Sequence, residues 1–416
     1  MPPAPFLILV LNSGSSSLKF AVHDIDMRAP LLSGLAERLG GEHPAITFKH
    51  LGTERVQSLA EASHAAALDA MLAELSRCGW VDQLGAVGHR VVHGGERFTS
   101  SVLVTQAVIA GIEACCPLAP LHNPAALLCL RVALERLPAI PHVAVFDTAF
   151  HQTMKPEVYL YALPMVLYRE QGIRRYGFHG TSHRFVAGEA VTLLGLDPAD
   201  HGIVTAHLGN GASATAVQDG RSVDTSMGMT PLEGLIMGTR SGDVDPGAVL
   251  HIMRTEGLGT AETDSLLNTK SGLLGLSELS NDCRELEMAA EQGHAGAQLA
   301  LEVFVHRLAR YIGGLAMALR RLDAIVFTGG IGENSVRVRA MTLARLRPLG
   351  FAVDALTNAC MTGGTGGLIS PPGVTPYAVV VATREEWMIA CDTARLARQG
   401  ADIPAETPAD TLAEAV

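Results

Sequence analysis

The sequence predicts an α/β protein made of two similar halves with a cleft between them. Residues 9–22 (LVLNSGSSSLKFAV) and 204–217 (VTAHLGNGASATAV) share one pattern: an apolar strand, a turn of small residues and a second alternating strand. Strands alternate with helical patterns after each of these hairpins, which is typical of α/β layers. A chain of 416 residues also exceeds the usual size of a single core. We therefore expect two domains and a ligand cleft between them.

The first half is predicted to begin with strands at 6–11 and 18–22. A helix follows over 60–77, because Leu68, Met71 and Leu75 recur at intervals of three and four and form one apolar face. The remaining predicted elements of this half are a strand over 86–92, helices near 105–115 and 123–136, and a strand over 142–147.

The second half repeats this order. It has predicted strands at 203–208 and 213–218, helices at 244–256 and 296–320, a short buried strand at 324–327 and a final strand at 377–382. Gly329 and Gly330 follow the buried strand as a loop, and a helix is predicted to begin at Ser335. A last helix, over 384–398, completes the core.

Composition excludes several classes of partner. The formal net charge of -11 argues against nucleic acid or an anionic membrane, since both favour basic surfaces. No apolar run approaches the ~18 residues that cross a bilayer. The seven cysteines are odd in number and lack a CxxC spacing, which favours free thiols in a reducing compartment. The apolar run at 6–11 lacks a basic flank and does not resemble a signal peptide. We expect a cytoplasmic protein.

Three glycine-rich segments are candidate phosphate sites. In the first, residues 12–17, small side chains leave backbone N–H groups free to surround an anion, and Lys19 adds charge; an ordinary polar hairpin turn explains this segment equally well. The second is residues 207–211 and the third residues 328–334, which lie between a strand and a helix. The third lacks the Gly-Lys-Ser/Thr of a P-loop and the spacing of a dinucleotide fingerprint. Together the three favour nucleotide binding.

Two arginines occupy unusual positions. Arg90 lies in an apolar strand, where it must either form a structural salt bridge or face a ligand. Arg240 lies in a glycine-rich loop (GTRSGD) that can present it to an anion. Two such arginines suit a carboxylate on one side and a phosphoryl group on the other.

Other polar residues leave alternatives open. His122 and His179 occupy loops bounded by proline or glycine, and for either one taken singly a structural hydrogen bond is favoured over a functional role. Asp147 ends a strand, at a position suited either to a metal ligand or to a cap. Glu385 and Glu386 begin the last helix, a place that the helix dipole favours for acids without any metal.

These motifs, taken in order, resemble one family. NSGSSSLKF, GHRVVHGGERF, PLHNP, FDTAFH, YGFHGTSH, HLGNGAS, MTPLEGLIMGTRSGDVDPG and FTGGIGENS are similar to the motifs of acetate kinases, from residue 7 to about 395. The resemblance implies a duplicated ribonuclease H-like (actin-like ATPase) fold with an interdomain active-site cleft. It implies domain I over 1–148 plus 385–416, and domain II over 149–384, which carries most of the nucleotide site.

The resemblance also implies a reaction: direct, reversible in-line transfer of a phosphoryl group from ATP to acetate, giving acetyl phosphate and ADP, in a homodimer that uses Mg²⁺, with Mn²⁺ as an alternative. The catalytic residues that it implies are Asp147, His179, Arg240 and Arg90. It places Asn12 and Glu385 at the metal. The nucleotide-binding residues that it implies are Ser17, Lys19, His207, Leu208, Gly209, Asn210, Gly211, Asp282, Cys283, Arg284, Gly330, Ile331, Gly332, Glu333 and Asn334.

By the same resemblance, acetate contacts Arg90 and His122, and its methyl group lies in a small apolar pocket of Val92, Leu121, Phe178 and Pro231. Acetate is already ionised at pH 7, so its transfer needs alignment and charge neutralisation more than a strong base. A sugar kinase, a chaperone-like ATPase and a non-catalytic nucleotide sensor are the alternatives. A sugar kinase would need an aspartate base for its hydroxyl acceptor, and a sensor would not need Arg90, Asp147, His179, Arg240 and Glu385.

Overall fold

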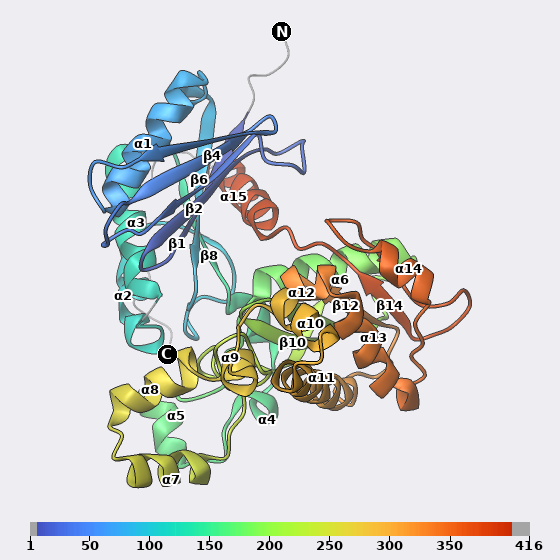
Figure 1. The fold of residues 1–416 in the computed structure, drawn as a ribbon. Coiled ribbons are helices and arrows are strands. Elements are labelled where there is room, and N and C mark those ends of the chain that lie inside the picture. The colour runs from blue at the N-terminus through green and yellow to red at the C-terminus, as the bar shows by residue number, and fades with distance from the viewer. Residues whose placement is uncertain (1–5, 121, 402–416) are drawn as a thin grey trace, which may run out of the picture.

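The computed structural model describes residues 6–120 and 122–401. Its chain forms two lobes, each built on one β-sheet (Figure 1). The first sheet has the order β5-β4-β3-β2-β1-β6-β8-β7. Its strands are β1 (Leu7–Ser13), β2 (Ser17–Asp24), β3 (Leu32–Glu37), β4 (Ala45–His50), β5 (Thr53–Ser58), β6 (Leu84–Val91), β7 (Val102–Leu103) and β8 (His142–Phe146).

The second sheet repeats the central part of the first. Its order is β11-β10-β9-β12-β14-β13, with strands β9 (Gly202–Leu208), β10 (Ala212–Gln218), β11 (Arg221–Thr225), β12 (Ala324–Thr328), β13 (Gly367–Leu368) and β14 (Tyr377–Val380). In both sheets an antiparallel hairpin is followed by two parallel strands, β1-β6-β8 in the first and β9-β12-β14 in the second. The predicted duplication of the frame is therefore present.

Helices cover the sheets and join the lobes. They are α1 (His64–Arg77), α2 (Gln106–Ala114), α3 (Asn123–Arg136), α4 (Pro156–Tyr159), α5 (Met165–Gln171), α6 (Gly180–Leu194), α7 (Pro246–Glu256), α8 (Thr260–Thr269), α9 (Gly272–Ser277), α10 (Cys283–Glu291), α11 (Ala295–Ala316), α12 (Gly329–Asn334), α13 (Val336–Arg345), α14 (Ala355–Cys360) and α15 (Glu385–Ala401). No helix among the described residues is long and apolar enough to cross a membrane.

The last helix returns to the first lobe. In α15, Ile389, Ala390 and Ala394 are buried with Ile8 of β1 and Val145 of β8. The same helix also packs against α6 of the second lobe. The chain therefore crosses between the lobes twice, after β8 and before α15, and residues 385–401 lie with the first sheet (Figure 1).

Several elements differ from the sequence prediction. The strands β3, β4 and β5 were not predicted, because they are short and β5 is exposed along its whole length, so no apolar alternation marks it. Helix α1 begins at His64, not at residue 60, because the Ser63 side chain caps it. Helix α11 ends at Ala316, not at 320, shortly after the unfavourable pair Gly313 and Gly314.

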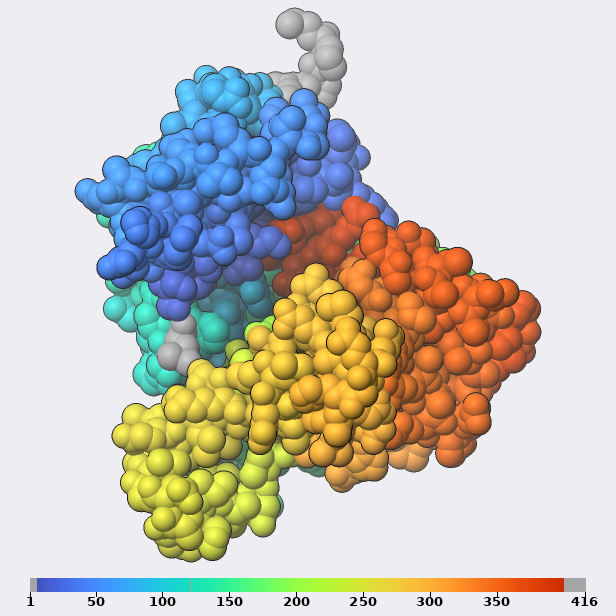
Figure 2. Space-filling model, in the orientation of Figure 1, coloured from blue at the N-terminus to red at the C-terminus, as the bar shows by residue number. Residues whose placement is uncertain are grey.

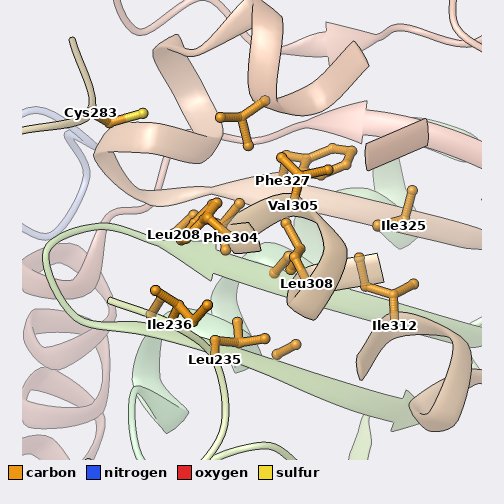
Figure 3. Packing of buried hydrophobic residues seen from close by; sticks show 14 of the residues in the cluster. Leu208, Leu235, Ile236, Cys283, Phe304, Val305, Leu308, Ile312, Ile325 and Phe327 are labelled. Carbon is orange, nitrogen blue, oxygen red and sulfur yellow. The ribbon is translucent and has the colours of Figure 1, made fainter. Parts of the chain in front are cut away.

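The core of the second lobe lies between α11 and the sheet. Phe304, Val305 and Leu308 of α11 pack against Ile325 and Phe327 of β12 (Figure 3). Leu208, at the end of β9, belongs to the same buried cluster. This packing fixes the strand ends from which the second glycine hairpin projects.

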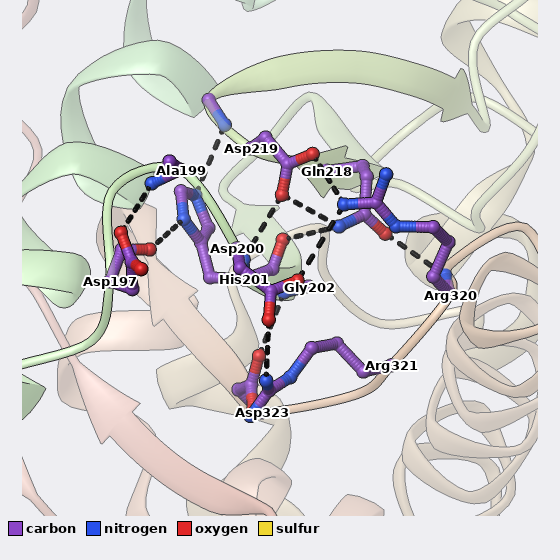
Figure 4. A network of polar contacts seen from close by, with 11 residues as sticks. Asp197, Ala199, Asp200, His201, Gly202, Gln218, Asp219, Arg320, Arg321 and Asp323 are labelled. Atoms are coloured by element: carbon purple, nitrogen blue, oxygen red, sulfur yellow. Dashed lines mark hydrogen bonds and ion pairs between the residues drawn. The ribbon is translucent and has the colours of Figure 1, made fainter.

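A polar network closes the opposite end of the second sheet (Figure 4). The backbone N–H of Gly202 donates to Asp323 and that of His201 donates to Asp219, at 2.8 and 3.0 Å. Arg320 and Arg321 pair with Asp219 and Asp323 respectively. The start of β9 is thus held by two carboxylates that are themselves paired with arginines. The rest of the strand is held by the apolar core.

Candidate active site

The carboxyl ends of the parallel strands in the first sheet bring three predicted residues together. Arg90 of β6 lies beside Val145 of β8 in the sheet register, two residues before Asp147. Its Nε and Nη2 donate to Asp147 at 3.0 and 2.6 Å, and its Nη1 donates to Asn12 Oδ1 at 3.3 Å. Arg90 therefore forms a structural ion pair, but one fifth of its side chain remains exposed. Both roles considered for Arg90 are compatible with this geometry.

The charge of Arg90 is stabilised where it lies. Burial lowers the pKa of its guanidinium, but the carboxylates of Asp147 and Glu385 outweigh burial and raise that pKa. Glu385 is the first residue of α15, and its Oε1 lies 3.9 Å from His207 Nδ1. Helix α15 thus brings a second carboxylate, from the end of the chain, to the Arg90 and Asp147 pair.

His179 is held in a strained backbone conformation at the start of α6. Its φ is 55°, in the left-handed region, which a non-glycine residue rarely adopts unless its surroundings require it. The next residue is docked tightly: the Gly180 N–H donates to the Asp147 backbone oxygen, and a Cβ at Gly180 would lie 2.3 Å from that oxygen. The bend therefore brings the His179 imidazole to the Asp147 strand end.

His179 is a neutral imidazole in this environment. Its Nδ1 lies 2.9 Å from Ser213 Oγ, and its ring stacks on that of His207 with centroids 4.4 Å apart. Burial, together with His207 and His183, lowers the pKa of His179 well below its ordinary value. Burial likewise lowers the pKa of His122, and the positive charges of Arg240 and Arg90 lower it further.

Arg240 is the unpaired cation of the site. Its Nη1 donates to the Pro231 carbonyl at 3.3 Å and approaches Met237 Sδ at 3.8 Å, and no carboxylate of the described residues lies within ion-pair distance. Burial lowers the pKa of its guanidinium. A largely buried guanidinium without a counter-ion favours binding of an anion.

Gly211 lies where these groups meet. A methyl group at this position would be 3.6 Å from both Arg240 Nη1 and His179 Nε2. The residues before it, Gly209 and Asn210, line a cavity of about 610 Å³ together with Asp282, Cys283, Arg284, Gly330, Ile331 and Asn334. Residues from the predicted nucleotide-binding segments 207–211, 282–284 and 330–334 therefore line one space of a size suited to a small-molecule ligand, whereas residues 12–17 do not line it.

Sequence reasoning missed part of this cavity. Asn281, Glu287 and Ser335 also line it. The only feature of the sequence that could have indicated them is that they lie close to predicted residues along the chain. The predicted glycine loop after β12 is in fact the short helix α12, beginning at Gly329. Gly329 takes a φ of 76° at the turn from β12 into this helix, a conformation that favours glycine.

Other predicted residues lie outside the cavity lining. Lys19 pairs with Glu386 at 2.5 Å and is half exposed. The Glu333 carboxylate accepts from the backbone N–H groups of Gly329 and Thr383, both at 3.0 Å, and so holds two loops together. Ser17 begins β2, where its carbonyl accepts from the Gly14 N–H. Leu208 is buried in the core, and Gly332 lies in α12 close to it.

The apolar pocket is partly described. Val92 packs against the buried cluster that contains Phe178, and Pro231 is tied to Arg240 through its carbonyl. Leu121 lies outside the described residues.

The duplicated α/β fold, the cavity at the second glycine hairpin and the nearby guanidinium of Arg240 are the features of a phosphotransferase of the kinase type. The Acetokinase family model matches residues 7–391. An acetate kinase of Chromobacterium violaceum is 53% identical over 94% of this chain and 98% of its own, and one of Deinococcus radiodurans is 55% identical over 93% and 97%. The chain belongs to the acetokinase family.

Solved structures agree with this assignment. The crystal structure of Porphyromonas gingivalis acetate kinase has a TM-score of 0.90 at 43% identity, covering 94% of this chain and 99% of that one. A propionate kinase from Francisella tularensis has a TM-score of 0.89 at 42% identity, covering 94% and 100%. The expected two-domain, actin-like ATPase fold is therefore confirmed.

Proposed function

We propose that this protein transfers a phosphoryl group directly and reversibly from ATP to acetate, giving acetyl phosphate and ADP. The observation that carries the proposal is the cavity of about 610 Å³, which ends at the hairpin turn beside Arg240 and His179. A nucleoside in this cavity would direct its phosphates over Gly209 and Gly211 towards the unpaired guanidinium. Arg90, held by Asp147, would orient the acceptor carboxylate on the other side.

The chemistry suits these residues. Acetate is ionised at pH 7 and needs no general base, so catalysis reduces to alignment and neutralisation of charge on the phosphoryl oxygens. Arg240 supplies positive charge that no protein carboxylate of the described residues neutralises. We assign Asp147 to organising Arg90 and the metal rather than to carrying a proton, because both of its oxygens already accept hydrogen bonds from Arg90.

The residues present fit Mg²⁺. Asn12, Asp147 and Glu385 offer oxygen donors, the ligand type that Mg²⁺ prefers, with Mn²⁺ as an alternative. No group of three or more His, Cys, Asp or Glu among the described residues is placed to hold a metal, and Mg²⁺ shared with nucleotide phosphates needs only one or two carboxylates. When bound, the ion would neutralise phosphate charge.

We further propose a division into domain I, residues 1–148 plus 385–416, and domain II, residues 149–384. The packing of α15 on β1 and β8 supports this division, although residues 402–416 lie outside the described residues. We propose a homodimer in the cytoplasm, with ATP, ADP, acetate and acetyl phosphate as its ligands. The seven cysteines are all free thiols, as a reducing compartment favours.

Trapping of acyl phosphate with hydroxylamine tests the proposal. The purified protein is incubated with Mg²⁺ and ATP over acetate, propionate, butyrate and glycerol. We expect acyl hydroxamate from acetate, and less from propionate, since one methylene in an apolar pocket changes the transition-state energy by only about 1–3 kcal/mol. Absence of hydroxamate from every acid would refute the kinase assignment, and ADP release with glycerol alone would favour a sugar kinase.

A further inference from the structure

Behind His179, three buried side chains form a chain of hydrogen bonds that the proposed reaction does not use. Ser213 Oγ lies 2.9 Å from His179 Nδ1 and 2.7 Å from His183 Nε2. On its other side, His183 Nδ1 lies 2.7 Å from Thr205 Oγ1. Thr205 Oγ1 in turn donates to the backbone carbonyl of Thr215 at 3.4 Å. Ser213, His183 and Thr205 are all 0% exposed, so bulk water does not compete for these bonds.

The fold brings these residues together from two elements. His183 lies in the first turn of α6, four residues after His179, which precedes the helix, and Ser213 Oγ contacts both imidazole rings. Thr205 and Ser213 lie on β9 and β10 of the second glycine hairpin, and Thr205 stands opposite Thr215 in its register. The hydrogen-bonded chain therefore ties the His179 bend to the hairpin that carries Gly211.

The donor and acceptor of each hydrogen bond can be assigned by starting at the Thr215 carbonyl. The Thr215 carbonyl can only accept, so the Thr205 hydroxyl donates its proton there and must accept from His183 Nδ1. Burial, with His151 and His207, holds the pKa of His183 well below its ordinary value, so its other nitrogen carries no proton. His183 Nε2 then accepts from the Ser213 hydroxyl, whose oxygen accepts from His179 Nδ1. For a neutral His183, only this direction satisfies all four bonds.

We propose that Ser213, His183 and Thr205 are positioning residues that hold His179 as the tautomer protonated on Nδ1. The Nε2 lone pair of His179 then faces the space shared by Gly211 and Arg240. This tautomer follows from the contacts of a neutral His183, and its catalytic consequence rests on the proposed function. Neutral His179 acts as an acceptor towards this space, and it can donate to a phosphoryl oxygen only after Nε2 gains a second proton. In either state Nδ1–H stays on Ser213, so the ring does not rotate.

The first experiment records the tautomer without substrate. Nitrogen-15 NMR of the labelled full-length protein, with the His179 signals assigned by their loss in His179→Asn, distinguishes a protonated Nδ1 from a protonated Nε2. We expect protonated Nδ1 in the unmodified protein. A protonated Nε2 would overturn the proposal. Because no turnover is involved, this result is independent of whether the protein phosphorylates acetate.

Thr205→Val tests the direction in which these hydrogen bonds are donated. Without the hydroxyl, His183 retains its bond to Ser213 best by protonating Nε2, because an unpaired buried acceptor costs less than an unpaired donor. The Ser213 hydroxyl must then donate to His179 Nδ1, which moves the His179 proton to Nε2. Thr205→Ser keeps the hydroxyl and is the matched control. We expect the tautomer to switch in Thr205→Val and to be unchanged in Thr205→Ser.

Kinetics separate positioning from a merely structural role. Because neutral His179 protonated on Nδ1 can donate to a phosphoryl oxygen only after Nε2 is also protonated, we expect kcat of the unmodified protein to rise as the pH falls. In Thr205→Val neutral His179 already carries the Nε2 proton, so this pH dependence of kcat should be lost, while KM for ATP and acetate changes less than twofold. Thr205→Ser should retain the pH dependence. Ser213→Ala, which removes the acceptor of His179 Nδ1–H, should lose it as well and serves if Thr205→Val does not fold. An unchanged tautomer and an unchanged pH profile in the folded variants would overturn the proposal.

Discussion

The two arginines of the site lie in opposite electrostatic environments. Arg90 is bonded to Asp147, whose side chain is only 2% exposed, so this pair contributes to the fold as well as to any ligand contact. Arg240 contacts a carbonyl and a thioether but no carboxylate of the described residues. We therefore expect substitution of Arg240 to affect chemistry alone, and substitution of Arg90 to affect both chemistry and stability.

Arg240→Ala should lower kcat about 10²- to 10³-fold with the fold intact, the range observed when one charge-stabilising donor is removed from a transition state. Steady-state kinetics with circular dichroism melting measure both quantities. Arg240→Lys is the matched control, since it retains the charge but not the planar fork of donors. An unchanged kcat in Arg240→Ala would remove this residue from the transition-state role.

Arg90→Ala should raise KM for acetate and leave KM for ATP nearly unchanged. It should also destabilise the protein by about 3 kcal/mol, because the buried Asp147 carboxylate loses its partner. Urea unfolding measures the second effect. The double variant Arg90→Ala, Asp147→Asn should recover part of the stability without recovering KM. Unaltered KM and kcat in Arg90→Ala would contradict the carboxylate contact.

At the scale of elements, the two hairpins share a frame but differ at the turn. The turn after β9 contains Gly209, which lines the cavity, and Gly211, which lies beside Arg240 and His179. The turn after β1 follows Asn12, which bonds Arg90, and its Gly14 carbonyl lies 2.9 Å from His64 Nε2. We infer that the second turn serves the nucleotide, whereas the first serves the metal and the phosphoryl group.

Gly211→Ala tests this division. The added methyl would meet Arg240 Nη1 and His179 Nε2 at 3.6 Å, an ordinary contact, so we expect unchanged thermal stability. The methyl would nevertheless occupy the space proposed for the phosphates of ATP, so kcat/KM for ATP should fall at least tenfold. Gly188→Ala in α6, where a methyl meets nothing within 4 Å, is the control and should leave activity unchanged. Equal activity of the two variants would place the phosphates of ATP elsewhere.

At the scale of the whole molecule, buried histidines make stability depend on pH. Burial lowers the pKa of His23, His93 and His151 from 6.5 to about 4. The unfolded chain therefore binds protons below pH 6.5 that the folded protein does not bind until about pH 4. The contribution of each buried histidine to the free energy of unfolding is therefore fully present above pH 6.5. It falls as the pH decreases towards 4, and roughly 2 kcal/mol per histidine is lost at pH 5.

His23→Phe isolates one of these histidines. Both nitrogens of His23 are buried and have no hydrogen-bond partner among residues 6–120 and 122–401, and its ring packs against Trp387 with centroids 5.6 Å apart. An apolar ring of similar shape should therefore be tolerated at pH 7.5. We expect the stability lost between pH 7.5 and pH 5, measured by urea unfolding, to shrink by roughly 2 kcal/mol. The same loss in both proteins would show that His23 does not titrate as described.

Much of the fold was predictable because its signals are local. The apolar strands around residues 9 and 204 and the amphipathic helix ending at Arg77 were correctly placed from periodicity. Strand β5 could not be predicted, since it is held by pairing with β4 and not by an apolar face. The site was predicted mainly through the resemblance of its motifs to acetate kinases. Asn281, Glu287 and Ser335 were missed because cavity lining depends on packing between segments.

The sequence by itself determined the duplicated frame, the family and the identity of the polar residues, because strand patterns and motifs are properties of contiguous residues. Only the tertiary structure decided what each polar residue contacts. It paired Arg90 with Asp147 and left Arg240 without a carboxylate among the described residues. It turned Glu333 towards backbone N–H groups and placed Ser213 behind His179. These outcomes depend on distances between remote segments, which set burial and hydrogen bonding and are not encoded in any single stretch of chain.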